Sequence, residues 1–240
     1  MKNQNIVKSF SLLLLFMSIT LQAQQKITVL EIDTGVDLKK HLALYDHISQ
    51  TKIQNSDDYI DLQSHGTHIA GIIIKDTCKE VELISCRYYI PSDTPSERDE
   101  RYYNCLKRAV VLKPYIVNFS SGGEEPLKNE YQYLKQLEQE NVIFVTAAGN
   151  FGENLTIFNY FPAKYNLTNM IVVGNLLPNG KYNPTSNYGL LGMKWMVGTN
   201  IYSTIPNGLY GFKTGTSMSA AAYSNKLLLE KCHEIHKQDN

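Results

Sequence analysis

Short apolar runs alternate with helix-length amphipathic stretches along most of this chain, and that alternation limits the folds it can adopt. The runs that read as strands, from their β-branched and aromatic content with little polar alternation, are residues 27–32, 81–88, 115–120, 142–147 and 170–174. Helices are expected over residues 65–74, 96–111, 127–140 and 217–236. This alternation predicts an α/β fold, a three-layer sandwich with a mostly parallel central sheet flanked by helices. In such sheets, active groups gather at the carboxyl ends of the strands.

The helix over residues 96–111 has a clear start signal. Thr94 can cap it, Pro95 suits the first helical position, and Glu97 completes a capping box. This helix is therefore expected to begin next to Pro95.

The first residues match an export signal. Lys2 and Lys8 form a short basic region, an apolar run covers residues 10–21, and Ala23 is the small residue that a signal peptidase needs before its cut. The run is shorter than the roughly 20 residues of a bilayer-spanning helix, so no stable membrane anchor is expected after cleavage. We expect residues 1–23 to be a signal peptide and the mature chain, residues 24–240, to be secreted or periplasmic. The alternative is a buried N-terminal helix.

Composition argues against a nucleic-acid partner but does not decide how the four cysteines are paired. The 240 residues carry 23 Lys and Arg against 23 Asp and Glu, and this balance argues against a nucleic-acid partner. The length suits one domain with a substantial core. Export would place Cys78, Cys86, Cys105 and Cys232 where disulfides persist, in any of three full pairings. Buried free thiols are the alternative to at least one bridge.

Two chemically active side chains lie in runs that are ambiguous on their own. Asp33 follows a strand and precedes Gly35, so its carboxylate can be held rigidly or can bond its own backbone in a turn. An aspartic-protease interpretation of this run fails because it needs a second copy. His65 opens a helix with His68 three residues on, but a zinc motif would need a glutamate at set spacing, which is missing. His68 alone is more typical of a hydrogen-bonded core residue.

Ser217 and Asn150 occupy positions suited to acyl chemistry. Gly215 precedes a serine that begins a helix, which exposes the Ser217 hydroxyl at the positive end of the helix dipole, next to free amide groups. Asn150 ends a strand and turn, where its side-chain amide can donate to an oxyanion. An ordinary serine cap and a left-handed turn asparagine are the alternatives.

Together and in this order, the four residues point to one mechanism. A serine becomes a nucleophile when a histidine takes its proton, and the histidine needs a carboxylate that fixes its tautomer. The motifs are residues 32–35 (Ile-Asp-Thr-Gly), 65–71 (His-Gly-Thr-His-Ile-Ala-Gly), 147–150 (Ala-Ala-Gly-Asn) and 215–218 (Gly-Thr-Ser-Met). In these motifs, and through residues 118–123 and 161–165, the chain resembles the subtilisin-like serine proteases, the subtilases of peptidase family S8. The resemblance covers roughly residues 26–230.

The resemblance implies a role for each residue. Asp33 would orient His65, His65 would act as general base and acid, Ser217 would be the nucleophile, and Asn150 would donate to the oxyanion. The substrate-binding residues implied in the same way are Ser120, Ser121, Gly122, Ala147, Gly149 and Tyr160. The first three would form an edge that pairs with an extended peptide. Ala147 and Gly149 would line the pocket for the side chain before the scissile bond, with Tyr160 at its floor.

The function expected from this resemblance is that of an exported serine endopeptidase. It would act on a peptide or protein substrate through an acyl-enzyme, as a monomer and without a cofactor. Residues 24–240 would form a minimal peptidase domain with no pro-domain before it. A peptide ligase or cyclase that uses the same acyl-enzyme is one alternative, and a catalytically silent peptide-binding relative is another.

Departures from the family pattern lead to a further expectation, that the protein has no metal site. Leu42 stands where the family often has a calcium-binding aspartate. Residues 75–80 are too few for the usual calcium loop and include two lysines that would oppose a cation. Ala221 replaces a usual proline, and residues 196–198 read Met-Val-Gly in place of Ala-Pro-Gly. None of these changes removes a catalytic group.

Overall fold

A six-stranded parallel sheet forms the centre of the protein. The structure, a computed structural model, describes residues 26–37, 39–41 and 61–238, so Leu42 and the predicted signal peptide lie outside the described residues. The strand order is β2-β1-β3-β4-β5-β6, and every neighbouring pair is parallel. These strands are β1 (Ile27–Asp33), β2 (Val81–Arg87), β3 (Ile116–Phe119), β4 (Ile143–Ala147), β5 (Met170–Leu176) and β6 (Lys194–Val197).

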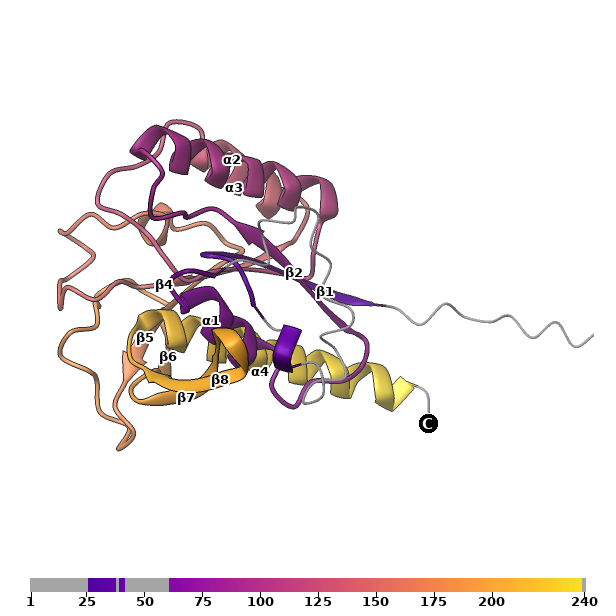
Figure 1. Cartoon of the computed structure of the whole chain (residues 1–240). Helices are drawn as coiled ribbons and strands as arrows, with labels where there is room; N and C mark the ends of the chain where they lie inside the picture. Colours follow the sequence, from indigo (N-terminus) through magenta and orange to yellow (C-terminus); the bar gives the residue numbers. More distant parts are fainter. Residues whose placement is uncertain (1–25, 38, 42–60, 239–240) are drawn as a thin grey trace, which may run out of the picture.

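Helices cover both faces of this sheet. The helices are α1 (His65–Ile73), α2 (Pro95–Leu112), α3 (Glu130–Gln139) and α4 (Thr216–Gln238), with short 3-10 turns η1 (Lys39–His41), η4 (Ala163–Tyr165) and η5 (Pro206–Gly208). Figure 1 shows α2 and α3 on one face of the sheet and α1 and α4 on the other. Within the described part of the chain, no helix is long and apolar enough to span a membrane.

Each face of the sheet has its own hydrophobic core. Val29 packs in the cluster that contains α1 and α4 residues, and its neighbour Leu30 packs in the cluster of α2 and α3. Ile116 and Val117 divide between the same two clusters. Successive side chains of a strand point to opposite faces, so a strand covered on both sides needs a continuous apolar run. The predicted three-layer α/β sandwich is confirmed.

All of the predicted helices and strands are present, with ends that differ by at most three residues. The capping box is also present: the Thr94 hydroxyl accepts from the Glu97 N–H (3.3 Å), and the Thr94 N–H donates to the Glu97 carboxylate (2.8 Å). The sequence did not predict β6 or the antiparallel pair β7 (Ile201–Ile205) and β8 (Leu209–Lys213). β6 and β8 are partly exposed and lack the continuous apolar run that marks a buried strand.

Two disulfides decide between the alternatives left open for the cysteines. Cys78–Cys232 joins the turn after α1 to the last part of α4, and Cys86–Cys105 joins β2 to α2. All four cysteines lie in the described part of the chain, and none is free. The bridges tie helices on both faces of the sheet to the segments beside them.

Gly66 provides a test of how closely α1 must approach the loop after β1. A Cβ at Gly66 would lie 2.1 Å from the carbonyl oxygen of Gly35, so Gly66→Ala must push the two segments apart. We expect this substitution to lower the free energy of unfolding by about 1–3 kcal/mol. Gly123→Ala is the matched control, because a Cβ there meets nothing within 4 Å. Equal denaturation midpoints for the two variants would contradict this packing.

Candidate active site

Three segments bring the predicted catalytic side chains to one edge of the sheet. Asp33 is the last residue of β1, His65 is the first residue of α1, and Ser217 is the second residue of α4. The parallel register of β1 and β3 aligns Ile32 with Phe119, so the segments that follow both strands emerge at the same edge.

Asp33 and His65 form the central contact of the site. The Asp33 Oδ1 atom lies 2.7 Å from the His65 Nδ1 atom and accepts a second hydrogen bond, also of 2.7 Å, from the Thr34 N–H. The Asp33 side chain is 3% exposed, whereas that of His65 is 27% exposed. The carboxylate therefore makes both kinds of contact considered from the sequence, since it bonds the backbone of its own turn and also contacts the histidine ring. A proton on Nδ1 leaves Nε2 free to accept one.

Opposing effects set the pKa of His65. Burial lowers this pKa, but the charge and hydrogen bond of Asp33 outweigh burial, so the pKa is raised above its ordinary value of 6.5. The charge of Lys213 acts against this rise. A histidine with this pKa is a stronger proton acceptor than a free imidazole.

His68, three residues further along α1, has a structural environment. Its side chain is buried, and its Nε2 lies 3.0 Å from the Ile201 carbonyl oxygen and 3.2 Å from that of Gly211. Burial lowers its pKa to about 4, so the ring is neutral at physiological pH. The interpretation of His68 as a hydrogen-bonded core residue is confirmed.

Ser217 is held by the segment that follows β3. Its hydroxyl donates to the Ser120 carbonyl oxygen at 2.9 Å, and the Ser120 hydroxyl donates to the Ser217 carbonyl oxygen at 3.1 Å. The two serines thus fix the start of α4 against the end of β3. The Ser217 hydroxyl must leave the Ser120 carbonyl before it can donate to His65.

Asn150 is oriented by the residue before the serine. Its Oδ1 atom accepts from the Thr216 N–H at 2.9 Å and from the Thr216 hydroxyl at 3.1 Å. Since the oxygen is turned toward α4 in this way, the Nδ2 amide group is left to donate elsewhere. The Asn150 backbone is not in the left-handed region, so the turn-asparagine alternative does not apply.

A buried carboxylate that sequence reasoning missed, Asp61, joins the segment after β1 to the first turn of α1, which begins at His65. It accepts hydrogen bonds from the Thr34 hydroxyl (2.9 Å), the Gln63 N–H (3.1 Å), the Thr67 N–H (2.8 Å) and the Thr67 hydroxyl (2.6 Å). The Thr34 hydroxyl in turn accepts from the Gly66 N–H at 2.9 Å. An isolated Asp four residues before the histidine carries no periodic signal, so only the fold reveals this role.

Two of the predicted substrate-binding residues, Gly122 and Gly149, lie against a third, Tyr160. A Cβ at Gly122 would lie 2.6 Å from the Tyr160 ring, and one at Gly149 would lie 3.0 Å from it, so the ring is in contact with both segments. Tyr160 is 7% exposed, and burial raises its pKa to about 12, which keeps the phenol neutral. The exposed Phe151 ring lies 6.0 Å from the Tyr160 ring. Ala147 is buried at the end of β4.

Asn187 shapes the loop after Asn150 and was also missed. Its Nδ2 donates to the Ala148 carbonyl oxygen at 2.9 Å, and its Oδ1 accepts from the Phe151 and Glu153 N–H groups, each at 3.0 Å. The side chain is fully buried. Its three contacts hold the loop that carries Asn150 and Phe151.

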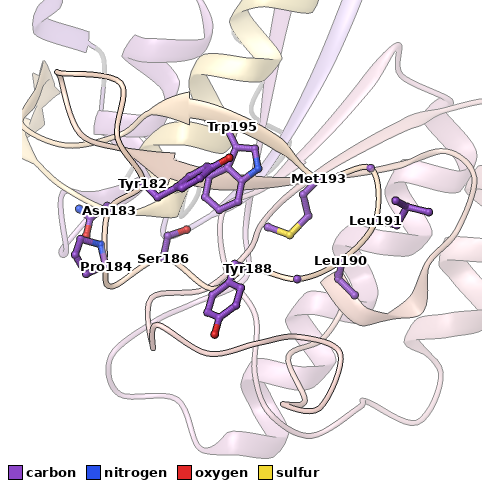
Figure 2. Close-up of a pocket in the computed structure, with 11 residues that line it drawn as sticks. Tyr182, Asn183, Pro184, Ser186, Tyr188, Leu190, Leu191, Met193 and Trp195 are labelled. Carbon is purple, nitrogen blue, oxygen red and sulfur yellow. The ribbon is translucent and has the colours of Figure 1, made fainter.

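Two cavities differ in their relation to this site. One, of about 430 Å³, includes Ser121 and Gly122, has aromatic walls, and carries Asp99, Glu124 and Glu130 among its lining residues. The larger one, of about 600 Å³, lies beside β6 between Tyr182, Tyr188 and Trp195 (Figure 2). None of the predicted site residues lines the larger cavity. We therefore place the active site by its chemistry and not by cavity size.

Comparison with known proteins places the chain in a family. The model of the subtilase family matches residues 24–232. The chain belongs to the subtilase family, and its relatives identify it as a subtilisin-like serine protease.

Two relatives show how far the similarity extends. Over 226 residues the chain is 31% identical to the major intracellular serine protease of Bacillus subtilis (strain 168), which covers 88% of this chain and 70% of that protein. It is 30% identical over 194 residues to subtilisin-like protease 3 of Plasmodium falciparum (isolate 3D7), covering 67% of this chain and only 24% of that protein.

Solved structures share the fold. A cold-adapted subtilisin-like serine proteinase superposes with a TM-score of 0.71 at 24% identity, covering 86% of this chain and 76% of that one. The patellamide maturation protease PatA gives a TM-score of 0.71 at 21% identity, covering 90% and 81% of the two chains.

The pKa of His65 leads to a test by pH. If His65 must be neutral to take a proton, kcat/KM rises as the pH passes through its pKa, with a midpoint above 6.5. Lys213→Gln removes a charge that lowers this pKa, so the midpoint should move to higher pH, whereas Lys213→Arg should leave it in place. A midpoint at or below 6.5, or a downward shift in Lys213→Gln, would contradict this assignment.

Asp61 leads to a second test. Asp61→Asn replaces one accepting oxygen with an amide that cannot accept, which costs at least about 1.5–3 kcal/mol of unfolding free energy. Because the loop positions shift with it, we expect kcat to fall more than KM rises. Asp37→Asn is the control, since among the described residues that carboxylate accepts one hydrogen bond, of 3.3 Å, from the Asn207 N–H. Normal kcat in Asp61→Asn would show that Asp61 does not position the site.

Proposed function

We propose that the mature chain is an exported endopeptidase that cleaves peptide bonds through an acyl-enzyme. Asp33 orients His65, His65 moves the proton, Ser217 is the nucleophile and Asn150 stabilises the oxyanion. The observation that carries the proposal is the 2.7 Å contact from a buried aspartate to the Nδ1 atom of a histidine with a raised pKa. A serine at the start of a helix, held at the same edge of the sheet, supports it.

The proposed reaction has two halves. In the first, the Ser217 Oγ attacks the substrate carbonyl carbon while its proton passes to the His65 Nε2, and the Asn150 amide donates to the oxygen that gains negative charge. The C–N bond then breaks, and His65 gives the proton to the departing amine. In the second half, water attacks the acyl carbon while His65 takes a proton from that water. The bond to the Ser217 Oγ then breaks, His65 gives this proton to Ser217, and the carboxylic acid product leaves. The reaction as written needs no cofactor.

The proposed substrate is an extended peptide or protein segment. Ser120, Ser121 and Gly122 follow β3 directly, and Gly122 is exposed, as an edge for peptide pairing requires. The Ser120 carbonyl oxygen accepts a hydrogen bond from the Ser217 hydroxyl. The same oxygen could accept one from a backbone N–H of the substrate. Ala147, Gly149 and Tyr160 would receive the side chain before the cleaved bond.

Export is the proposed location, and it rests on the signal at residues 1–23. The two disulfides support it, because such bridges persist in oxidising compartments. Family membership does not decide the compartment, since one relative is named an intracellular protease.

The proposed function is tested by peptide hydrolysis with purified variants. Ser217→Ala should lose hydrolysis while its circular dichroism and melting midpoint stay normal. Asn150→Ala should lower kcat by about 100- to 1000-fold with little change in KM, as expected when an oxyanion donor is lost. Full activity in Ser217→Ala would overturn the assignment. Product masses distinguish the alternatives, because hydrolysis adds a water and ligation does not, while a silent relative gives no product.

Tyr160 is predicted to restrict the residue before the cleaved bond. With its ring against Gly122 and Gly149, only small or medium side chains should enter, and the neutral phenol offers no charge for Lys or Arg. Tyr160→Gly should raise kcat/KM for Phe relative to Ala at this position by at least about tenfold, whereas Tyr160→Phe should not. A wild-type preference for Phe or Arg in a peptide library would contradict this prediction.

A further inference from the structure

A cluster of metal-binding side chain types lies at the far end of α4, outside the residues assigned to catalysis. The Sγ atom of Cys78, a carboxylate oxygen of Glu80 and a ring nitrogen of His236 all lie within 4.8 Å of one another. Cys232 completes the group, because it is bonded to Cys78. The His236 Nε2 atom is 3.4 Å from the Glu80 Oε2 atom.

One helix and one hydrogen-bonded turn present these four residues. Cys232 and His236 are four residues apart on α4, so their side chains share one helix face. Glu80 directly precedes β2, and its carbonyl oxygen accepts the Ile27 N–H at 2.9 Å, which ties it to β1. Cys78 closes the turn before it, with its carbonyl oxygen 3.1 Å from the Val81 nitrogen. The pair on α4 is thus held by a helix, and the turn that carries the other two residues is held by its hydrogen bonds to β1 and β2.

Burial and hydrogen bonding at this cluster suit thiolate ligands. The Glu80 side chain is 1% exposed, Cys232 is 4% exposed, and His236 covers them from the solvent side with 53% of its side chain exposed. The Cys78 N–H points at the Cys232 sulfur at 3.2 Å, and an amide donor of this kind stabilises a thiolate. Two sulfurs, one imidazole and one carboxylate make up a ligand set that zinc accepts.

We propose that reduction of the Cys78–Cys232 bridge converts this cluster into a zinc site, with Cys78, Cys232, His236 and Glu80 as ligands. This goes beyond the sequence, which predicted no metal residue, and it does not depend on the proposed peptidase function. Tetrahedral zinc with bonds of about 2.0–2.3 Å requires ligand atoms about 3.5 Å apart. The Cys78, Glu80 and His236 atoms, now within 4.8 Å of one another, must therefore close by about 1 Å, and the two sulfurs, bonded to each other in the disulfide, must separate once the bridge is reduced. A chain meets reducing conditions before export, and there a metal ion would fasten the end of α4 as the disulfide does afterwards.

A thiol or a phosphine is the reductant that opens the Cys78–Cys232 bridge. The disulfide takes two electrons and two protons and becomes two thiols, while the reductant becomes a disulfide or a phosphine oxide. Zinc then displaces one proton from each thiol and binds the neutral ring of His236 and the ionised Glu80. The two thiolates and the carboxylate carry three negative charges and Zn²⁺ carries two positive ones. The site therefore has a net charge of about −1 and lies next to Lys79 in the sequence.

Co²⁺ is the spectroscopic probe for this site. Protein carrying Cys86→Ser and Cys105→Ser, so that only Cys78 and Cys232 remain, is reduced with a phosphine and titrated with Co²⁺, and the same titration is made on reduced wild type. Both should show a thiolate-to-cobalt charge-transfer band and the visible bands of a tetrahedral site, which saturate at a single ion per chain and disappear when Zn²⁺ is added. The oxidised protein should show none of these bands.

A matched pair on α4 separates this site from adventitious thiol binding. His236→Ala should weaken Co²⁺ binding at least about tenfold, since even outer-shell partners of a metal contribute that much. His233→Ala removes another exposed histidine of the same helix and should change nothing. Only samples with equal far-ultraviolet circular dichroism are compared. If the double serine variant does not fold, His236→Ala and His233→Ala are each made in the wild-type chain, which is then reduced and titrated. The absence of tetrahedral bands in reduced protein, or equal affinities for His236→Ala and His233→Ala, would overturn the proposal.

Discussion

The arrangement of the catalytic edge depends on the parallel pairing of β1, β3 and β4. Their register aligns Ile32 with Phe119 and Phe119 with Thr146, so Asp33, Ser120 and the segment from Ala147 to Asn150 leave the sheet at one edge. The first turn of α4 then binds two of these strand ends. Ser217 exchanges hydrogen bonds with Ser120, and Thr216 donates to Asn150. The proposed nucleophile and the proposed oxyanion donor are therefore positioned by the same strands that position Asp33.

Electrostatics at this edge distinguish three carboxyl groups that lie close together. Asp33 faces His65, and Asp61 is surrounded by hydroxyl and amide donors. Glu31 is fully buried two residues before Asp33, and neither of its oxygens has a hydrogen-bond partner among the described residues. Burial, with the charges of Asp33 and Asp61, raises the pKa of Glu31 well above its ordinary value, which favours its neutral form. The negative charge that acts on His65 thus comes from Asp33 and, with less effect, Asp61.

The layers of the fold, which the structure confirms, and the four proposed catalytic positions could both be inferred from the sequence because both leave local signals. Buried parallel strands need apolar runs such as that of β1, and Ser217 and Asn150 sit beside glycines that mark turns. Asp61 and Asn187 had no such signal, since each acts through hydrogen bonds to residues brought near by the fold. The disulfide pairing could not be predicted for the same reason, because Cys78 and Cys232 are 154 residues apart. The signal peptide and Leu42 stay as predictions, outside the described residues.

Strand-end geometry is expected to make Ser217 reactive while its neighbours Ser120 and Ser219 are not. The most direct measurement is to treat the mature protein with a fluorophosphonate at several pH values and to locate the adduct by peptide mass spectrometry. We expect a single adduct, on Ser217, and we expect it to form faster as the pH rises and His65 loses its proton. An adduct on Ser120 or Ser219, or no adduct on folded protein at any pH, would contradict it.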